Sequence, residues 1–234
     1  MNELLLAGSV LLIFGAVLLS YRILGRQGLY AVTAIATILA NIEVLMVINA
    51  FGMEQTLGNV MFASTYLVTD ILSENEGKEY ASKAVKLGVF TSVIMFLFTQ
   101  YWLLYTPAQT DWAAEHIREI FSTTPRLLIA SFLGYVISQR FDVWLYHRIW
   151  EFTEKKSGSK KAYLWLRNNG STMVSQLINT FIFTFVAFTG WYDAKTLISI
   201  LVSSYIIYIF TSLLDTPVVY IARMLKEKGV IPEK

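Results

Sequence analysis

Cysteine is absent from this 234-residue chain, and histidine, proline and charged residues are scarce. Without a thiol, the chain has no disulfide framework, zinc-thiolate site or cysteine nucleophile. The two histidines are too few for a histidine-based metal site. No G-x-x-x-x-G-K-[ST] loop occurs, so the chain does not hydrolyse ATP by that device. A net charge of +2 points to no nucleic-acid partner. We therefore expect neither a metal nor a cofactor.

Apolar sequence is abundant instead: 55% of the residues are hydrophobic, 15% are charged, and the mean hydropathy is +0.52. The surface of a soluble domain needs more charge than this. A helix needs about 20 mainly apolar residues to span a bilayer. We predict an all-α integral membrane protein with seven transmembrane segments, at about residues 4–21, 29–50, 59–73, 84–105, 126–150, 171–190 and 196–222.

The basic residues predict how these segments are oriented. Lys and Arg concentrate in cytoplasmic loops, and fifteen of the nineteen follow the first, third, fifth and seventh segments. This pattern indicates seven crossings, with the N-terminus outside and the C-terminus inside. We expect DWAAEHIREIF (111–121) to form an amphipathic helix on the outer surface. Before the fifth segment, Thr124 can cap the helix and Pro125 can take its first position.

Four acids fall within the predicted segments: Glu43, Asp70, Asp142 and Asp215. An acid at the centre of a membrane helix costs about 2.5–3.5 kcal/mol on insertion scales. Such groups persist where they face the bundle interior, form pairs or contact a substrate. Arg140 allows three interpretations: it contacts a ligand, pairs with an acid, or extends its long side chain to the interface.

Polar side chains recur every four residues on five of the segments, and residues at i and i+4 share one helix face. Hydrogen bonding between helices would explain any single stripe. Five stripes together with three acids favour a solvated central cavity. The stripes comprise Thr33, Thr37 and Asn41; Tyr66, Asp70 and Glu74; Ser138, Asp142 and Tyr146; Thr172, Gln176 and Asn179 or Thr180; and Ser204, Tyr208, Ser212 and Asp215.

Two breaks strengthen the prediction of a cavity. Pro217 follows Asp215 by two residues and frees backbone carbonyls there. Before the sixth segment, Asn168 and Asn169 precede Gly170, and Ser171 can cap the helix. Interrupted helices at polar depth are typical of transporter binding sites, although an ordinary kink and an ordinary cap would explain these residues equally well.

Carboxylates, amides and aromatic rings suit a flat heterocycle that forms hydrogen bonds. A carboxylate accepts two parallel N–H bonds, as from the N1–H and exocyclic amine of a guanine-like edge. Aromatic rings offer stacking faces worth about 1–3 kcal/mol per base. The same groups would fit other polar solutes, and aromatic residues are also common as interfacial anchors.

Four motifs carry a resemblance to a known family: GNVMFASTYLVTDILSENEGKEYASKAVKLG (58–88), ISQRFDVWLYHRIW (137–150), LRNNGSTMVSQLINTFIF (166–183) and LLDTPVVY (213–220). In this order they resemble the queuosine precursor transporter family, formerly labelled vitamin uptake transporters. The resemblance implies uptake of 7-deazaguanine bases (preQ0 and preQ1, with queuine as a further candidate) across a bacterial cell membrane.

The same resemblance implies a six-helix core similar to the substrate-binding subunits of energy-coupling-factor transporters. We accordingly divide the chain into an additional N-terminal helix (1–25), a six-helix transporter domain (26–226) and a cytoplasmic tail (227–234). The family motifs imply roles in substrate binding for seven positions, to which we add Arg140 and Asp215. The seven are Asn41, Asp70, Gln139, Asp142, Ser171, Gln176 and Asn179.

Our hypothesis places Asp70 and Asp142 on the N–H edge of the base. Gln139, Gln176 and Asn179 would serve its carbonyl and ring nitrogens. Lipids are the remaining partners that we expect, together with a homodimer contact through the small residues of GSVLLIFG (8–15).

Two alternatives stay open. The chain could be a binding subunit that needs partner ATPases and takes a vitamin as its ligand. A membrane enzyme of the aspartyl intramembrane protease type fits less well, because the Gly-x-Gly-Asp context is missing. We therefore predict a transporter and no enzymatic activity.

Overall fold

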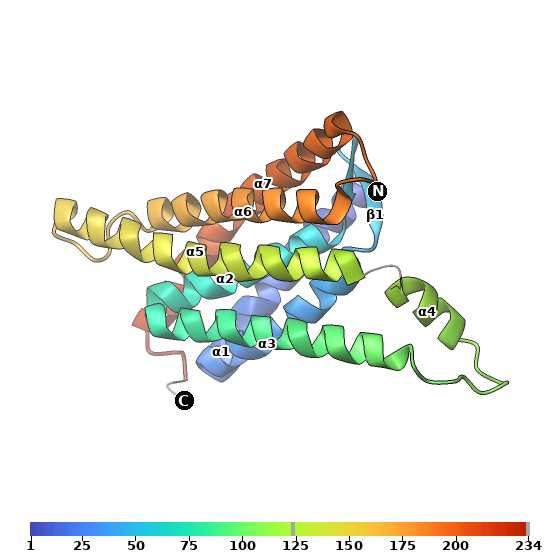
Figure 1. Cartoon of the computed structure of the whole chain (residues 1–234). Coiled ribbons are helices and arrows are strands. Elements are labelled where there is room, and N and C mark those ends of the chain that lie inside the picture. The colour runs from blue at the N-terminus through green and yellow to red at the C-terminus, as the bar shows by residue number, and fades with distance from the viewer. Residues whose placement is uncertain (123–124, 233–234) are drawn as a thin grey trace.

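The computed structural model describes residues 1–122 and 125–232, which are folded mainly into helices (Figure 1). The stretch predicted to be amphipathic at 111–121 forms a short helix, and the long apolar stretches form long ones. Along the chain the elements are α1 (Asn2–Glu43), β1 (Val47–Ala50), β2 (Met53–Thr56), α2 (Gly58–Asn75), α3 (Lys78–Trp102), α4 (Ala114–Ser122), α5 (Pro125–Ser157), α6 (Leu164–Phe188) and α7 (Ala194–Glu227).

Helix α1 reverses its direction at Gly25. This residue has φ 57° and ψ −143°, a conformation that essentially only glycine adopts. A straight helix of 42 residues would be about 63 Å long. Yet Asn2 Nδ2 donates to the Asn49 carbonyl oxygen at 2.8 Å, and Glu3 accepts from the Phe51 amide. Helix α1 therefore consists of two antiparallel arms on either side of Gly25, where the first two segments were predicted.

The second arm is shorter than predicted. It ends at Glu43, and strands β1 and β2 then form an antiparallel hairpin. The turn residues Phe51 and Gly52 both have positive φ, 54° and 73°, as in a type I′ turn. The prediction of a segment continuing to residue 50 was wrong, because the β-branched Val47 and Ile48 and the turn glycine favour a hairpin over a further helical turn.

The helices run alternately between two ends of the bundle. The first residues of α1 contact the β1–β2 hairpin at one end, which we call the hairpin end (Figure 1). At the other end, Glu76 accepts a hydrogen bond from the Tyr21 hydroxyl at 2.8 Å and pairs with Lys226 Nζ at 2.9 Å. The ends of α2 and α7 therefore meet the turn of α1 there, and we call this the Glu76 end.

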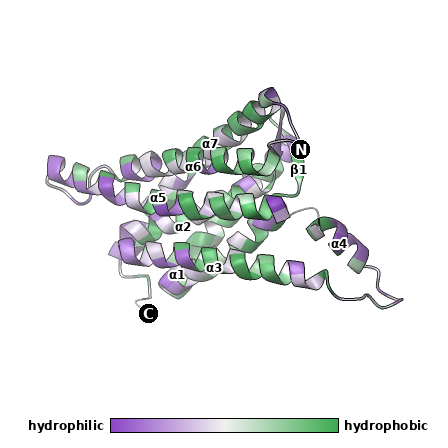
Figure 2. Cartoon of the chain, in the orientation of Figure 1, coloured by the Kyte–Doolittle hydropathy of each residue, from purple (hydrophilic) through white to green (hydrophobic). Residues whose placement is uncertain are grey.

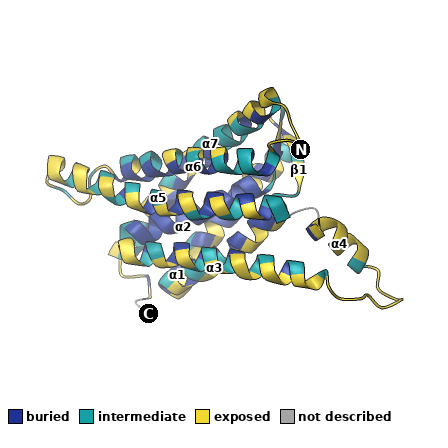
Figure 3. Ribbon diagram, in the orientation of Figure 1, coloured by how far each residue is buried: buried dark blue, intermediate teal, exposed yellow. Residues whose placement is uncertain are grey.

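Helix α2 is the most enclosed helix of the bundle (Figure 3). Fifteen of its 18 residues are buried, so its many polar side chains face other helices and not the surroundings. Within the described residues, α1, α3, α6 and α7 are long and apolar enough to span a bilayer, and α4 with α5 forms one further bent candidate. Many large hydrophobic side chains of these helices are exposed. Figure 2 shows long hydrophobic stretches along α3, α5, α6 and α7.

The starts of the fifth and sixth predicted segments can be compared with the structure. Pro125 is the first residue of α5, as predicted, whereas Thr124 lies outside the described residues. Helix α6 begins at Leu164, so Ser171 lies two turns inside the helix and cannot cap it. The expected cap was wrong because Asn168 and Asn169 hydrogen-bond to α7 and are compatible with continued helix.

The tight turn of α1 leaves no space for a side chain at Gly28. A Cβ atom there would collide with the Ser20 carbonyl group across the turn, whereas a Cβ at Gly15 would meet nothing within 4 Å. We expect Gly28→Ala to destabilise the purified protein by about 1–3 kcal/mol, the usual range for overpacking. Gly15→Ala is the matched control, because alanine is the better helix former and should not lower stability. Thermal unfolding in detergent measures both, and equal unfolding temperatures would contradict the reversal at Gly25.

Candidate functional site

Two tyrosine hydroxyls join α2 to α5. Tyr66 Oη donates to Ser138 Oγ at 2.6 Å, and Tyr146 Oη donates to Glu74 Oε2 at 2.7 Å. The partners of both bonds are 72 residues apart, so the two helices run in the same direction with a constant offset. The polar stripes that the sequence indicated on these helices therefore face each other.

Asp70 and Asp142 lie at the level between these two hydrogen bonds. Asp70 follows Tyr66 by one helical turn, and Asp142 follows Ser138 by one turn. Both aspartates are buried, at 0% exposure. They lie near each other and near Asp215 of α7, so that their carboxylates would repel one another if ionised. We call these three residues the acid cluster.

Helix α6 supplies partners to two of the three acids. Thr172 Oγ1 donates to Asp70 Oδ2 at 2.9 Å, and Asn168 Nδ2 donates to Asp215 Oδ1 at 2.8 Å. The two bonds cross from one helix to two different neighbours, α2 and α7. The acid cluster is therefore held in place by side chains of α6.

Asp142 is the least satisfied member of the cluster. It lies beside the hydroxyls of Ser171 and Ser175, yet neither of its oxygens is in hydrogen-bonding geometry with any described residue. Asp70 Oδ1 and both amide atoms of Gln176, one turn beyond Thr172, also lack a described partner. A buried polar atom without a partner costs about 1–3 kcal/mol. These five atoms are therefore the places where water or a ligand would complete the hydrogen bonding.

Gln139 differs from Gln176 in this respect. Its Nε2 donates to Thr65 Oγ1 at 2.8 Å, and its Oε1 accepts from Thr69 Oγ1 at 3.3 Å. The side chain is buried at 0% exposure. Gln139 thus makes a helix–helix contact of the kind that often holds membrane bundles together.

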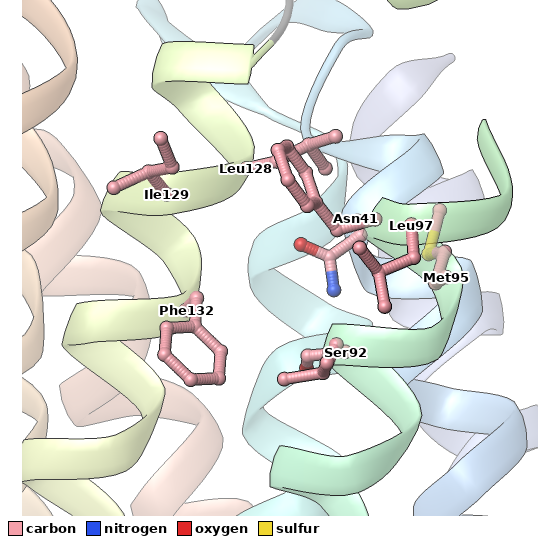
Figure 4. Close-up of a pocket in the computed structure, with 9 residues that line it drawn as sticks. Asn41, Ser92, Met95, Leu97, Leu128, Ile129 and Phe132 are labelled. Atoms are coloured by element: carbon pink, nitrogen blue, oxygen red, sulfur yellow. The ribbon is translucent and has the colours of Figure 1, made fainter. Parts of the chain in front are cut away.

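Asn41 and Asn179 line two separate cavities nearer the hairpin end. Asn41 borders a cavity of about 230 Å³ between α1, α3 and α5, with Phe132 on the facing helix (Figure 4). Asn179 borders a pocket of about 30 Å³ together with Asn59 of α2. None of the three acids lines either cavity. The predicted site residues are therefore distributed over the acid cluster and two further places.

Two other charged residues lie outside the cluster. Arg140 is exposed, although its helical neighbours Gln139 and Asp142 are fully buried. This exposure agrees with the interpretation in which its long side chain extends to the interface. Glu43 is half-buried at the end of α1, next to the hairpin.

A buried ion pair that we did not predict lies one turn beyond Asp70. Glu74 receives two hydrogen bonds from the Arg167 guanidinium, at 2.8 and 2.6 Å, and Arg223 approaches the same carboxylate at 3.1 Å. Arg167 is 0% exposed and also stacks over the Trp150 ring, 4.2 Å from its centre. With the Tyr146 hydroxyl, this carboxylate is fully satisfied.

The sequence indicated the position of only one member of this ion pair. Glu74 continues the stripe of Tyr66 and Asp70, so its face was predictable. Arg167, however, was counted among the basic residues of a connecting loop. It could be recognised as buried only once α6 was known to begin at Leu164.

Among residues 1–122 and 125–232, no three His, Asp or Glu side chains are grouped so as to hold a metal ion.

Comparison with known proteins places this arrangement in a family. The family model described as "Putative vitamin uptake transporter" matches residues 56–222, from the end of β2 into α7. The chain belongs to this family. A relative from Bacillus subtilis (strain 168), named "Probable queuosine precursor transporter", is 40% identical over 210 residues, which cover 90% of each chain. No solved structure shows a significant match.

The protein is thus a member of a transporter family with several long apolar helices, as a multi-pass membrane protein requires. The matched range contains Asp70, Asp142, Asp215 and the Glu74–Arg167 ion pair. Both arms of α1, with Asn41, precede it. The family match therefore covers the acid cluster and all of its described hydrogen-bond partners.

The Glu74–Arg167 pair predicts a large effect on stability. Glu74→Gln would leave a buried guanidinium with a neutral partner, and loss of one member of a buried pair typically costs about 3–5 kcal/mol. Glu79→Gln is the control, because the pair of Glu79 with Lys83 is exposed and such pairs contribute little. Thermal unfolding should separate the two variants clearly. Adding Arg167→Met to Glu74→Gln should restore part of the loss, and a double variant no more stable than Glu74→Gln would count against this explanation.

Proposed function

We propose that this transporter takes up queuosine precursors, namely the 7-deazaguanine bases preQ0 and preQ1, with queuine as a further candidate. Membership of the transporter family supports uptake of a small molecule. The name of the relative that is 40% identical, "Probable queuosine precursor transporter", supports this substrate class. The acid cluster suits the guanine-like hydrogen-bonding edge that these bases share.

The observation that carries the proposal is the set of five unpartnered polar atoms at Asp70, Asp142 and Gln176. A guanine-like edge presents the N1–H and the exocyclic amine side by side, and a carboxylate with two free oxygens can accept both bonds. We assign this edge to Asp142, with the free oxygen of Asp70 beside it. The amide of Gln176 offers one donor and one acceptor to the ring carbonyl and a ring nitrogen.

The other predicted residues take supporting roles in this proposal. Ser171 and Asp215 complete the polar lining around the base. Gln139, whose amide is already bonded to α2, positions the helix that carries Asp142. Asn179 and Asn41 lie nearer the hairpin end, where they would meet the base before or after it occupies the acid cluster.

We further propose seven crossings of a bacterial cell membrane, with the N-terminus outside and the C-terminus inside. The alternation of the helical arms between two ends supports an odd number of crossings, because the N-terminus lies at the hairpin end and the last helix ends at the Glu76 end. Arg26, Arg223 and Lys226 surround the acids of the Glu76 end, which supports a cytoplasmic location for that end.

Uptake in cells tests the substrate class. In a bacterial strain that cannot make deazaguanines, we expect expression of this chain to restore accumulation of labelled preQ1 or preQ0 at low concentrations, with guanine as the competitor. Vesicles that contain the purified protein and no ATP should also take up the base. A strict requirement for added ATPase subunits would favour the alternative of an energy-coupling-factor type binding subunit.

Replacing the Asp142 carboxyl group by an amide should weaken binding without unfolding the protein. A hydrogen bond to a charged group contributes about 1.5–3 kcal/mol, so we expect Asp142→Asn to bind labelled base at least tenfold more weakly. The neighbouring Ser171 and Ser175 hydroxyls donate to backbone carbonyls of α6, and neither Asp142 oxygen is in hydrogen-bonding geometry with a described residue, so we expect the substitution to preserve the fold. Arg140→Ala is the control, because Arg140 is exposed and should not affect affinity. Unchanged affinity in Asp142→Asn would reject the assignment of the N–H edge.

The two buried glutamines should respond in opposite ways to the same substitution. Gln176→Met removes an unpartnered amide, so we expect weaker binding with equal or greater thermal stability. Gln139→Met removes two hydrogen bonds to α2, so we expect its main effect to be a lower unfolding temperature. Parallel measurements of base affinity and unfolding temperature distinguish these results. The proposal for Gln176 fails if its variant is destabilised and binds the base normally.

A further inference from the structure

A third cavity, far larger than the two beside Asn41 and Asn179, opens at the hairpin end. It has a volume of about 680 Å³ and is lined by the β1–β2 hairpin, the end of α6 and the start of α7. Figure 1 shows these three elements together near the N-terminus. Cavities that bind small molecules typically measure about 300–1,000 Å³. The size of this hairpin-end cavity is therefore sufficient for a bicyclic base.

One wall of the hairpin-end cavity is aromatic. Phe183, Phe188 and Tyr192 all line it. The rings of Phe183 and Phe188 meet edge to face with centres 5.7 Å apart, and those of Phe188 and Tyr192 are also 5.7 Å apart. Such rings provide stacking faces that accept any planar base, at about 1–3 kcal/mol per base.

The hairpin contributes a buried amide group whose nitrogen has no hydrogen-bond partner among the described residues. Gln55 of β2 lines the same cavity and is only 4% exposed. Its Nε2 has no hydrogen-bond partner among the described residues. A buried amide donor without a partner is unfavourable in the empty protein. A change of side-chain rotamer would turn this enclosed Nε2 toward a ring carbonyl in the cavity.

The hairpin-end cavity is separate from the acid cluster but shares a lining residue with the pocket beside Asn59 and Asn179. Phe183 lines both the hairpin-end cavity and the pocket of about 30 Å³ beside Asn59 and Asn179. That pocket has room for little more than one water molecule. Beyond it, Phe62 packs edge to face against Tyr66, with ring centres 5.7 Å apart. Aromatic side chains therefore stand between the cavity and Asp70.

We propose that the hairpin-end cavity is a second binding site, which holds a planar base between its aromatic wall and the Gln55 amide before the base reaches the acid cluster. The proposal rests on the proposed function, since it assumes the same substrate. It adds a site on a different part of the chain, with Gln55 as its specificity-determining donor.

The first test separates transport from stability. We expect Gln55→Met to reduce initial uptake of labelled preQ1 at low concentration at least fivefold, through a raised KM, with no fall in the unfolding temperature. A purely structural role for Gln55 would instead lower that temperature. Gln109→Met makes the same change at an exposed position before α4, and should leave uptake unchanged.

The second test uses the absence of cysteine from the chain. Ser199 lines the cavity and is exposed, so Ser199→Cys should react with a membrane-impermeant maleimide. We expect preQ1 to slow this reaction. The same protection should persist when Asp142→Asn has removed high-affinity binding at the acid cluster. Combining Ser199→Cys with Gln55→Met should abolish the protection.

The outcomes distinguish this site from the proposed function. Normal uptake by Gln55→Met, or protection that disappears with Asp142→Asn alone, would overturn the second site and leave the acid cluster as the binding site. If the wild-type chain neither binds nor takes up any deazaguanine, the proposed function fails, and the ligand assigned to this cavity fails with it.

Discussion

The burial of polar side chains along α2 is the constraint on which the rest of the structure depends. Fifteen of the 18 residues of this helix are buried, and its polar face includes Asp70 and Glu74. In an apolar environment each such group must find a partner or bind water, because the alternative costs several kcal/mol. The neighbouring helices are arranged accordingly: α5 brings Tyr146 to Glu74, α6 brings Thr172 to Asp70, and both bonds fix the rotation of those helices about their axes.

The number of hydrogen-bond partners of these acids changes along α2. At the Glu76 end, Glu74 is bonded to Arg167 and Tyr146 and approached by Arg223, so its carboxylate is fully paired. One turn earlier, Asp70 retains a free oxygen, and the facing Asp142 has two. Complete pairing joins α2, α5, α6 and α7, whereas incomplete pairing leaves capacity for a ligand. In our proposal, acids on the same face of α2 differ in role because different partners lie within their reach, although their sequence spacing is the same.

The sequence pattern predicted features of individual helices, namely their positions and their polar faces. It located the long helices and α4, and the i, i+4 spacing correctly identified the faces of α2 and α5 that meet. It could not predict contacts that depend on two helices together. The bonds of Gln139 to Thr65 and Thr69, and the pairing of Arg167 with Glu74, join residues 70 or more positions apart. The hairpin at residues 47–56 was missed because the first of its two turn residues is Phe51, for which positive φ is unusual, so that Gly52 alone indicated a turn.

The two ends of the bundle differ in a way that suits directional movement of a solute. The hairpin end contains a cavity of about 680 Å³, and between the acid cluster and the Glu76 end lies a fully paired ion pair. A carrier that admitted water from both sides at once would act as a channel, so one side must be closed when the other is open. In the proposed orientation, the Glu74–Arg167 pair is placed to close the cytoplasmic side while the base is received from outside. Release inward would then require α6 to move relative to α2, and the same motion would separate Thr172 from Asp70 and weaken the acid cluster's hold on the base.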